Sequence, residues 1–223
     1  MKAQRTLAFL LLAAIAMAAL ALGCSRRPTS TAEVPRVVSP AYSIAVMPFT
    51  QPTDACQLIM GRIPENQGCI DSGTLALLDA DLRDLLLRKQ NGRVFAFEGP
   101  GVLPRVDALT YRSSSQPQAL PRWIALGRKT GKDLMFVPMV MDWHERQGSE
   151  AGVDKPAHVR VEMYLVRCAT GSVVSRGAWE EEQTGLADNL LNVGTFVKRK
   201  GQWVTARRLA QEGMESILKE IGL

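Results

Sequence analysis

Side chains that could act as nucleophiles or metal ligands are few in this chain of 223 residues, which has four cysteines and two histidines. His144 and His158 lie in separate segments, and neither a C-x-x-C nor an H-E-x-x-H spacing occurs, so the sequence predicts no metal site. Cys168 has no histidine partner that can be inferred from the sequence, and no Gly-x-Ser-x-Gly motif is present. We therefore predict that the protein is not an enzyme and uses no cofactor.

The first cysteine follows a segment with the pattern of an export signal. Residues 1–23 begin with two basic side chains and continue with an apolar run at 7–22. The run ends in Ala21, a leucine and Gly23, directly before Cys24. This stretch resembles the bacterial lipoprotein signal and its lipobox, with alanine where the motif usually has leucine. The resemblance implies cleavage between Gly23 and Cys24 and lipidation of Cys24.

A retained transmembrane helix, or an ordinary secreted protein, is the alternative interpretation of this start. The apolar run is shorter than the ~20 residues that a membrane-spanning helix needs, which favours the lipoprotein. Ser25, in place of aspartate, favours the outer membrane on its periplasmic side, with the inner membrane as the alternative. Residues 24–41 then form the lipidated N-terminus and a proline-containing flexible linker, and residues 42–223 form one globular domain.

Charge and cysteine usage limit the partners and the cross-links. The formal net charge of +5 falls to +3 when residues 1–23, with their two basic side chains, are removed. So small a charge gives no reason to expect a nucleic-acid partner. An oxidising compartment permits a disulfide, and Cys56 and Cys69 share one loop-like stretch. We predict that these two are bonded, which would stabilise the fold by about 3 kcal/mol.

Hydrophobic periodicity predicts an α+β domain. Alternating or continuous apolar runs indicate strands, and apolar residues at three-and-four spacing indicate helices. The predicted strands are 42–49, 94–97, 133–143, 158–167 and 172–180, and the predicted helices begin near 72, 121 and 204. This order predicts a mixed five-stranded sheet covered by about three helices.

Three motifs carry a resemblance to a known group of envelope proteins. They are the apolar strand Ile44–Phe49, the junction Leu126–Leu134 and the strand–turn–strand segment Leu165–Val174. Together they resemble the fold shared by the N-terminal domain of TolB, the curli secretion lipoprotein CsgG and the synthase activator LpoB. The resemblance covers the chain from about Tyr42 to its end, and it implies an envelope binding or assembly role without naming a partner.

Three functions follow from this resemblance. We expect a non-catalytic interaction or assembly module that is anchored to the membrane and binds another envelope protein. The alternative is a periplasmic module that binds a small molecule or a glycan. A CsgG-like pore subunit is disfavoured, because the connection at 144–157 is short and charged and cannot supply membrane-spanning strands.

One segment near the C-terminus combines apolar, aromatic and basic residues, as interfaces often do. The candidate interface residues are Leu190, Leu191, Phe196, Lys198, Arg199, Lys200 and Trp203. The alternative is that the apolar members of this set pack beneath the segment itself.

Overall fold

The computed structural model describes residues 38–103, 115–149, 152–183, 199 and 202–223. These residues all lie in one compact unit. The main elements, in chain order, are β1 (Ile44–Val46), α2 (Ser72–Arg88), β2 (Phe95–Phe97), α4 (Leu120–Thr130), β3 (Leu134–His144), β6 (His158–Arg167), β7 (Val173–Glu182) and α6 (Ala206–Glu220).

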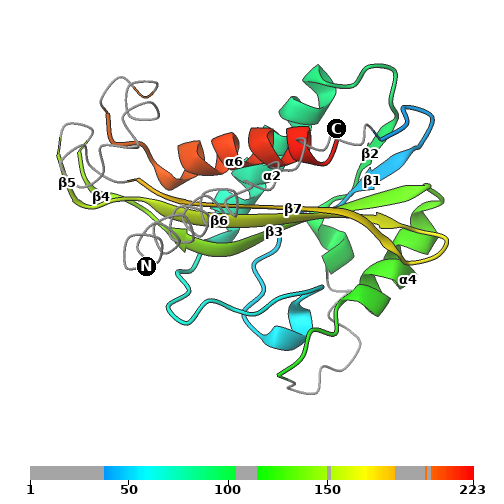
Figure 1. Ribbon diagram of the computed structural model, residues 1–223, viewed down its shortest axis with the longest axis horizontal. Helices are drawn as coiled ribbons and strands as arrows, with labels where there is room; N and C mark the ends of the chain where they lie inside the picture. Colours follow the sequence, from blue (N-terminus) through cyan, green and yellow to red (C-terminus); the bar gives the residue numbers. More distant parts are fainter. Residues whose placement is uncertain (1–37, 104–114, 150–151, 184–198, 200–201) are drawn as a thin grey trace, which may run out of the picture. The chain divides into compact units, whose positions relative to one another are not determined.

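These strands form one mixed sheet in the order β2-β1-β3-β6-β7 (Figure 1). Strand β1, which lies between β2 and β3, is parallel to both of them. The longer strands β3, β6 and β7 pair antiparallel. The predicted mixed five-stranded sheet with three helices is therefore confirmed. No helix in the described ranges is long and apolar enough to cross a membrane.

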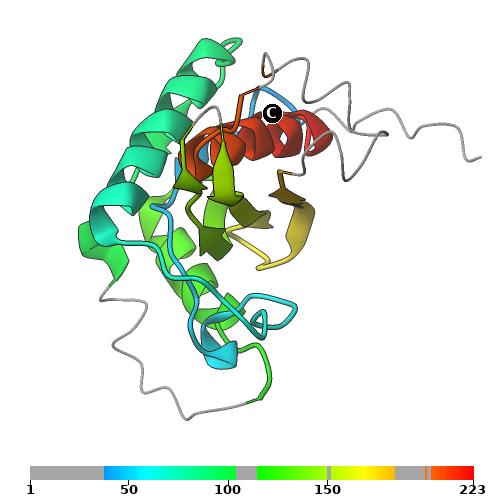
Figure 2. The same cartoon turned by 90° about the vertical axis from the view of Figure 1, so that its left-hand side faces the viewer.

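Both faces of the sheet are covered at β1 and β3, which explains why these two strands are apolar almost throughout. Helices α2 and α6 lie on one face, and α4 with the loop after β1 lies on the other (Figures 1 and 2). Alternate residues of β3 divide accordingly. Phe136 and Val140 join the cluster beneath α2 and α6, whereas Val137 and Met139 join the cluster around Trp123 of α4.

Local signals fix where the helices begin and end. Asp71 is the N-cap of α2 and accepts the Thr74 N–H through Oδ1 at 2.9 Å. Thr205 caps α6 in the same way. Helix α4 ends at Gly131, whose φ of 66° lies in the left-handed region that glycine adopts without strain.

Some short elements were not predicted. The predicted strand 42–49 contains only three residues of regular strand, Ile44–Val46. The connection between β3 and β6 holds the strands β4 (Gln147–Gly148) and β5 (Val153–Lys155), which pair with each other. Two single-turn helices, η1 (Ala55–Gln57) and η2 (Pro100–Val102), lie in loops. Elements of two or three residues are too short to show a period in the sequence.

Candidate functional site

Most of the residues singled out in the sequence lie outside the described part of the chain. This holds for Gly23 and Cys24 at the signal junction. It also holds for five of the candidate interface residues, which are Leu190, Leu191, Phe196, Lys198 and Lys200. Cleavage, lipidation and this part of the interface therefore stay predictions.

Arg199, a candidate interface residue, belongs to an internal ion-pair network. Its side chain is only 5% exposed, and Nη2 lies 2.6 Å from both Glu181 of β7 and Glu212 of α6. Burial alone would lower the pKa of Arg199, but the hydrogen bonds from these two carboxylates outweigh it and raise the pKa. Trp203 is half-buried, and its carbonyl accepts a hydrogen bond from Arg146. Arg199 therefore holds the strand to the helix.

The two cysteines of the predicted disulfide are free in the structure. Cys56 is buried in the α4-side cluster, next to the Asp54 side chain that caps η1, and burial raises the pKa of its thiol. Cys69 is exposed. The bond between them stays a prediction.

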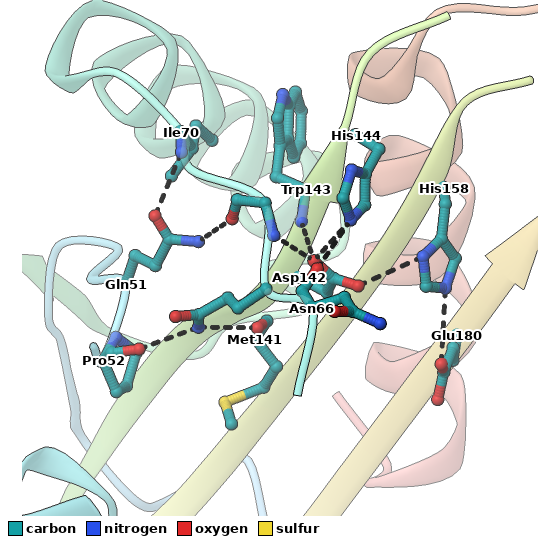
Figure 3. Close-up of polar contacts among 12 residues, drawn as sticks. Gln51, Pro52, Asn66, Ile70, Met141, Asp142, Trp143, His144, His158 and Glu180 are labelled. Atoms are coloured by element: carbon teal, nitrogen blue, oxygen red, sulfur yellow. Dashed lines mark hydrogen bonds and ion pairs between the residues drawn. The ribbon is translucent and has the colours of Figure 1, made fainter. Parts of the chain in front are cut away.

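The structure brings together two histidines that the sequence places in different segments. His144 ends β3 and His158 begins β6, and the antiparallel register sets the two directly opposite each other. A β-bulge between Val140 and Asp142 shifts this register by one residue. Asp142 lies two residues before His144 and therefore faces the same two rings. Figure 3 shows the three side chains converging from the two strands.

Asp142 is at the centre of this group and is nearly buried, with a side chain 6% exposed. Its Oδ1 accepts two backbone N–H groups, that of Gly68 at 2.7 Å and that of the next residue, Trp143, at 2.9 Å. The same oxygen lies 3.1 Å from Nε2 of His144, and Oδ2 lies 3.1 Å from Nδ1 of His158. Two backbone donors therefore fix the carboxylate in one orientation between the rings.

The rings themselves have further acceptors. Nε2 of His144 lies 3.2 Å from the carbonyl of Asn66, and Nε2 of His158 lies 3.3 Å from Oε1 of Glu180 on β7. The ring planes are nearly parallel, with centroids 5.8 Å apart. One ligand atom from each of Asp142, His144 and His158 lies within 4.8 Å of the other two, a grouping that could hold a metal ion.

The loop between β1 and α2 closes over this group and is itself held by side-chain amides (Figure 3). Gln51 donates to the Gly68 carbonyl at 2.6 Å and accepts the Ile70 N–H at 3.0 Å. Gln67 donates to the Met141 carbonyl of β3 at 2.8 Å. A Cβ at Gly68 would lie 2.0 Å from the Trp143 carbonyl oxygen, so only glycine permits this close approach.

Sequence reasoning missed this site because it looked for spacing along the chain. The signal was nevertheless present, because 133–143 and 158–167 were both predicted as strands. Pairing them antiparallel around the connection at 144–157 would have set His144 opposite His158. Which strands pair, and the bulge at Asp142, could not be inferred from a single sequence.

Strand β7 presents a different kind of surface. Among the described residues it pairs only with β6, so its outer edge is unpaired over ten residues. The strand has four exposed residues on one of its faces, which are Val174, Arg176, Ala178 and Glu180. Beneath them lies Glu162 of β6, a fully buried carboxylate whose charge is compensated by neighbouring side chains.

A cavity of about 530 Å³ lies at the carboxyl ends of β1 and β2, beside the first turns of α2. In sheets of this kind the carboxyl ends of parallel strands are common ligand sites. The lining is mostly apolar, and its polar members are Ser72, Asp79, Arg83, Asp84 and Glu98. Asp79 accepts the Phe49 N–H at 2.7 Å, and burial raises the pKa of its carboxyl.

The chain matches no family model and no curated protein sequence. Solved structures that are similar to it include the following three. The PelC dodecamer from Paraburkholderia phytofirmans is 12% identical, with 83% of this chain and 91% of that chain covered and a TM-score of 0.43. A lipoprotein from Neisseria meningitidis is 16% identical, with 72% and 94% covered and a TM-score of 0.37. The LpoB C-terminal domain from Escherichia coli is 14% identical, with 65% and 86% covered and a TM-score of 0.36. LpoB, which the motifs resemble, is thus among the solved structures that are similar to this chain.

Proposed function

We propose that the protein is a lipoprotein of the bacterial envelope whose folded domain binds another envelope protein. Cys24 would carry the lipid, and the domain would face the periplasm from the outer membrane, with the inner membrane as the alternative. The lipobox ending at Gly23 and Cys24 supports the anchor. In this proposal the domain is not catalytic and acts by contact.

The observation that supports a protein partner most directly is the unpaired edge of β7. A long exposed edge offers a row of backbone N–H and C=O groups with which an extended segment of another protein can pair. Arg176 is positively charged and Glu180, four residues later on the strand, is negatively charged. A partner segment would need charges of the opposite sign at the facing positions. This requirement would exclude non-specific pairing while permitting a cognate partner.

The candidate interface segment leaves the sheet at the same place. Gln183 directly follows β7, and its side chain donates to the Gln202 carbonyl and accepts the Val204 N–H, each at 2.8 Å. Gln183 and Gln202, which flank the candidate interface residues in the sequence, therefore lie side by side at the end of β7. We propose that this segment and the β7 edge form one binding surface.

In-cell photo-crosslinking tests this surface. A photo-reactive amino acid is placed at Val174 or Ala178 on β7, and the matched control is Leu77, which is 46% exposed on α2. We expect one envelope protein to be captured from the β7 positions and not from the α2 position. Capture should also be lost in Cys24→Ala, since the unanchored chain leaves the membrane.

Two outcomes would count against the proposal. Equal capture from β7 and α2 would mean that the edge of β7 is not the binding surface. Identical capture by Cys24→Ala would mean that the lipid anchor is not needed to meet the partner.

The cavity at the ends of β1 and β2 supports a second candidate, the binding of a small molecule. Its volume is within the range of ordinary ligand pockets. Ala76 of α2 lines it, so Ala76→Trp would fill the space. If the cavity is a ligand site, native mass spectrometry of the protein from its own envelope should show a bound compound that is absent from Ala76→Trp. If the unaltered protein and Ala76→Trp both have the mass of the protein alone, with no bound compound, the small-molecule function is refuted.

A further inference from the structure

We propose that Asp142, His144 and His158 bind a divalent transition-metal ion of the zinc type. This goes beyond the proposed protein-binding function and does not depend on it. The site differs from the sequence prediction of no metal site, which considered only spacing along the chain.

The separations between the ligand atoms suit a small cation. Zinc binds histidine nitrogen and carboxylate oxygen at roughly 2.0–2.2 Å, so two ligands of a tetrahedral site are about 3.3–3.5 Å apart. The two histidine nitrogens each lie 3.1 Å from an oxygen of Asp142. Small side-chain rotations would therefore open the group enough to admit the ion, without backbone movement.

The hydrogen-bonding pattern of His158 calls for a positive charge between the ring and the two carboxylates. His158 has a carboxylate oxygen next to each ring nitrogen, Asp142 at Nδ1 and Glu180 at Nε2. A neutral imidazole has one N–H and can donate to only one of them, whereas a protonated ring donates to both. A metal ion between Nδ1 and Asp142 would take the place of that proton and accept both lone pairs, while Nε2–H donates to Glu180.

The outer contacts are those that metal sites ordinarily have. A ligating histidine usually donates its second ring N–H to a carboxylate or carbonyl, which fixes the tautomer and the ring orientation. Glu180 occupies that position for His158, with 3.3 Å between Oε1 and Nε2. The Gly68 and Trp143 amides hold Asp142 from the other side. The carboxylate is thus oriented before any ion arrives.

The nature and exposure of the ligands indicate which ions could enter. Two imidazoles and a single carboxylate suit zinc, nickel or copper, whereas calcium and magnesium need more oxygen ligands. The side chains of His144 and His158 are 44% and 23% exposed, so an ion can reach them from solvent. They line a depression of about 600 Å³ that also contains Cys69 and Glu182.

A metal here would have a structural consequence. Asp142 accepts the Gly68 N–H from the loop between β1 and α2. An ion that fixes the Asp142 side chain would therefore also fix this part of the loop to β3, whereas His144 would exchange its contact with the Asn66 carbonyl for the ion. Metal removal should therefore increase hydrogen exchange at Gly68 and its neighbours more than in the core of β6.

The test uses the full chain as the cell produces it, purified in detergent with a tag that contains no histidine and stripped of metal with EDTA. Zinc affinity is measured by competition with a chromophoric chelator. We expect one Zn²⁺ per chain. His144→Gln and His158→Asn, which place an amide near the lost ring nitrogen, should each weaken binding at least about 100-fold. Glu180→Gln, as an outer partner, should weaken it about 10–100-fold.

Two matched controls separate the site from its surroundings. Glu182→Gln and Cys69→Ser alter the same depression without touching the proposed ligands, and each should leave the zinc affinity unchanged. If a histidine variant fails to fold, the proposal is tested on the unaltered chain by adding Co²⁺ and recording the visible absorption spectrum. Visible absorption bands that Zn²⁺ abolishes would support the site. Absence of such bands, or unchanged zinc affinity in the double variant of His144 and His158, would overturn it.

Discussion

The buried carboxylate of Glu162 is expected to be a main determinant of the stability of the β6–β7 half of the sheet. Its side chain is 1% exposed and accepts three hydrogen bonds. Arg160 and Arg176 each donate at 2.8 Å, and the Tyr164 hydroxyl donates at 2.5 Å. We predict that Glu162→Gln, which preserves the shape and removes the charge, will lower the free energy of unfolding by about 3 kcal/mol at neutral pH.

The magnitude follows from what each partner loses. A hydrogen bond to a charged group stabilises by about 1.5–3 kcal/mol and a neutral one by about 1 kcal/mol. In Glu162→Gln the two hydrogen bonds from arginine are weakened because the charge is lost. The new side-chain NH₂ also takes the place of an oxygen that accepted a hydrogen bond, so two donors then face each other. Removing one member of a buried ion pair ordinarily costs about 3–5 kcal/mol. The lower end applies here, because Arg160 and Arg176 are 29% and 39% exposed and can be rehydrated.

The effect should depend on pH in a defined direction. Burial alone would raise the pKa of Glu162, but the hydrogen bonds from Tyr164, Arg176 and Arg160 outweigh it and hold the pKa below its ordinary value. A group whose pKa is lower in the folded state stabilises the fold above its unfolded pKa, and this stabilisation is lost as the pH falls through the folded pKa. The difference between the two proteins should therefore be complete at pH 7 and shrink below roughly pH 4.3.

Urea unfolding followed by circular dichroism, at pH 7 and at pH 3.5, measures both the size and the pH dependence. The control is Glu182→Gln on β7, an exposed glutamate whose replacement should change stability by less than about 0.5 kcal/mol. The reasoning is refuted if Glu162→Gln is as stable as the unaltered protein at pH 7, or if its deficit grows as the pH is lowered.

Three other perturbations test the packing, the ion pairs and the cysteines. Gly177→Ala on β7 should lower stability by about 1–3 kcal/mol in thermal unfolding, because the added Cβ would lie 2.4 Å from Ile217 Cγ2 on α6; Gly99→Ala, which would meet nothing within 4 Å, should be nearly neutral. Arg199→Gln should lower the free energy of unfolding in urea by about 2 kcal/mol and leave partner capture unchanged, since its side chain lies between two carboxylates. Loss of capture with unchanged stability would mean that Arg199 contacts the partner. In the native protein a thiol reagent should label Cys69 alone, and the two buried cysteines only after denaturation. If the disulfide predicted from the sequence forms, no thiol should react in the native state and one after denaturation.

The fold was predictable because each long element has its own periodic signal. The apolar stripe on residues 75–86 predicted a helix, and in α2 Leu78, Leu82, Leu85 and Leu86 are buried. The alternation in 158–167 predicted a strand with one apolar side, and β6 has those limits. What the pattern did not show is that the other side of β6 is buried as well. Glu162 and Tyr164 are both fully buried, with the Tyr164 hydroxyl donating to Glu162 and Arg176 of β7 donating to Glu162 as well.

The metal site was not predictable from one sequence, for a related reason. A ligand pair at a spacing of three or four residues on a helix can be found from the chain, but cross-strand ligands depend on register. His144 and His158 become neighbours only through the pairing of β3 with β6. The bulge between Val140 and Asp142 shifts this register by one residue, and it is this shift that sets His144 opposite His158. Asp142 lies two residues before His144 and therefore points to the same face.

Both the proposed metal site and the proposed binding edge lie on the same face of β6 and β7, and their chemistry connects them. His158 contacts Glu180, Glu180 contacts Arg160, and Arg160 contacts Glu162, each through an ion pair. Apolar side chains and α4 cover the β1–β3 part of this face, whereas the β7 part is lined by charges. A metal at His158 would fix the position of Glu180, which is exposed on the edge strand. Binding of a partner along β7 should then be weaker after metal removal. Photo-crosslinking from Ala178 with and without EDTA would reveal this coupling, and equal yields would show that the two sites act independently.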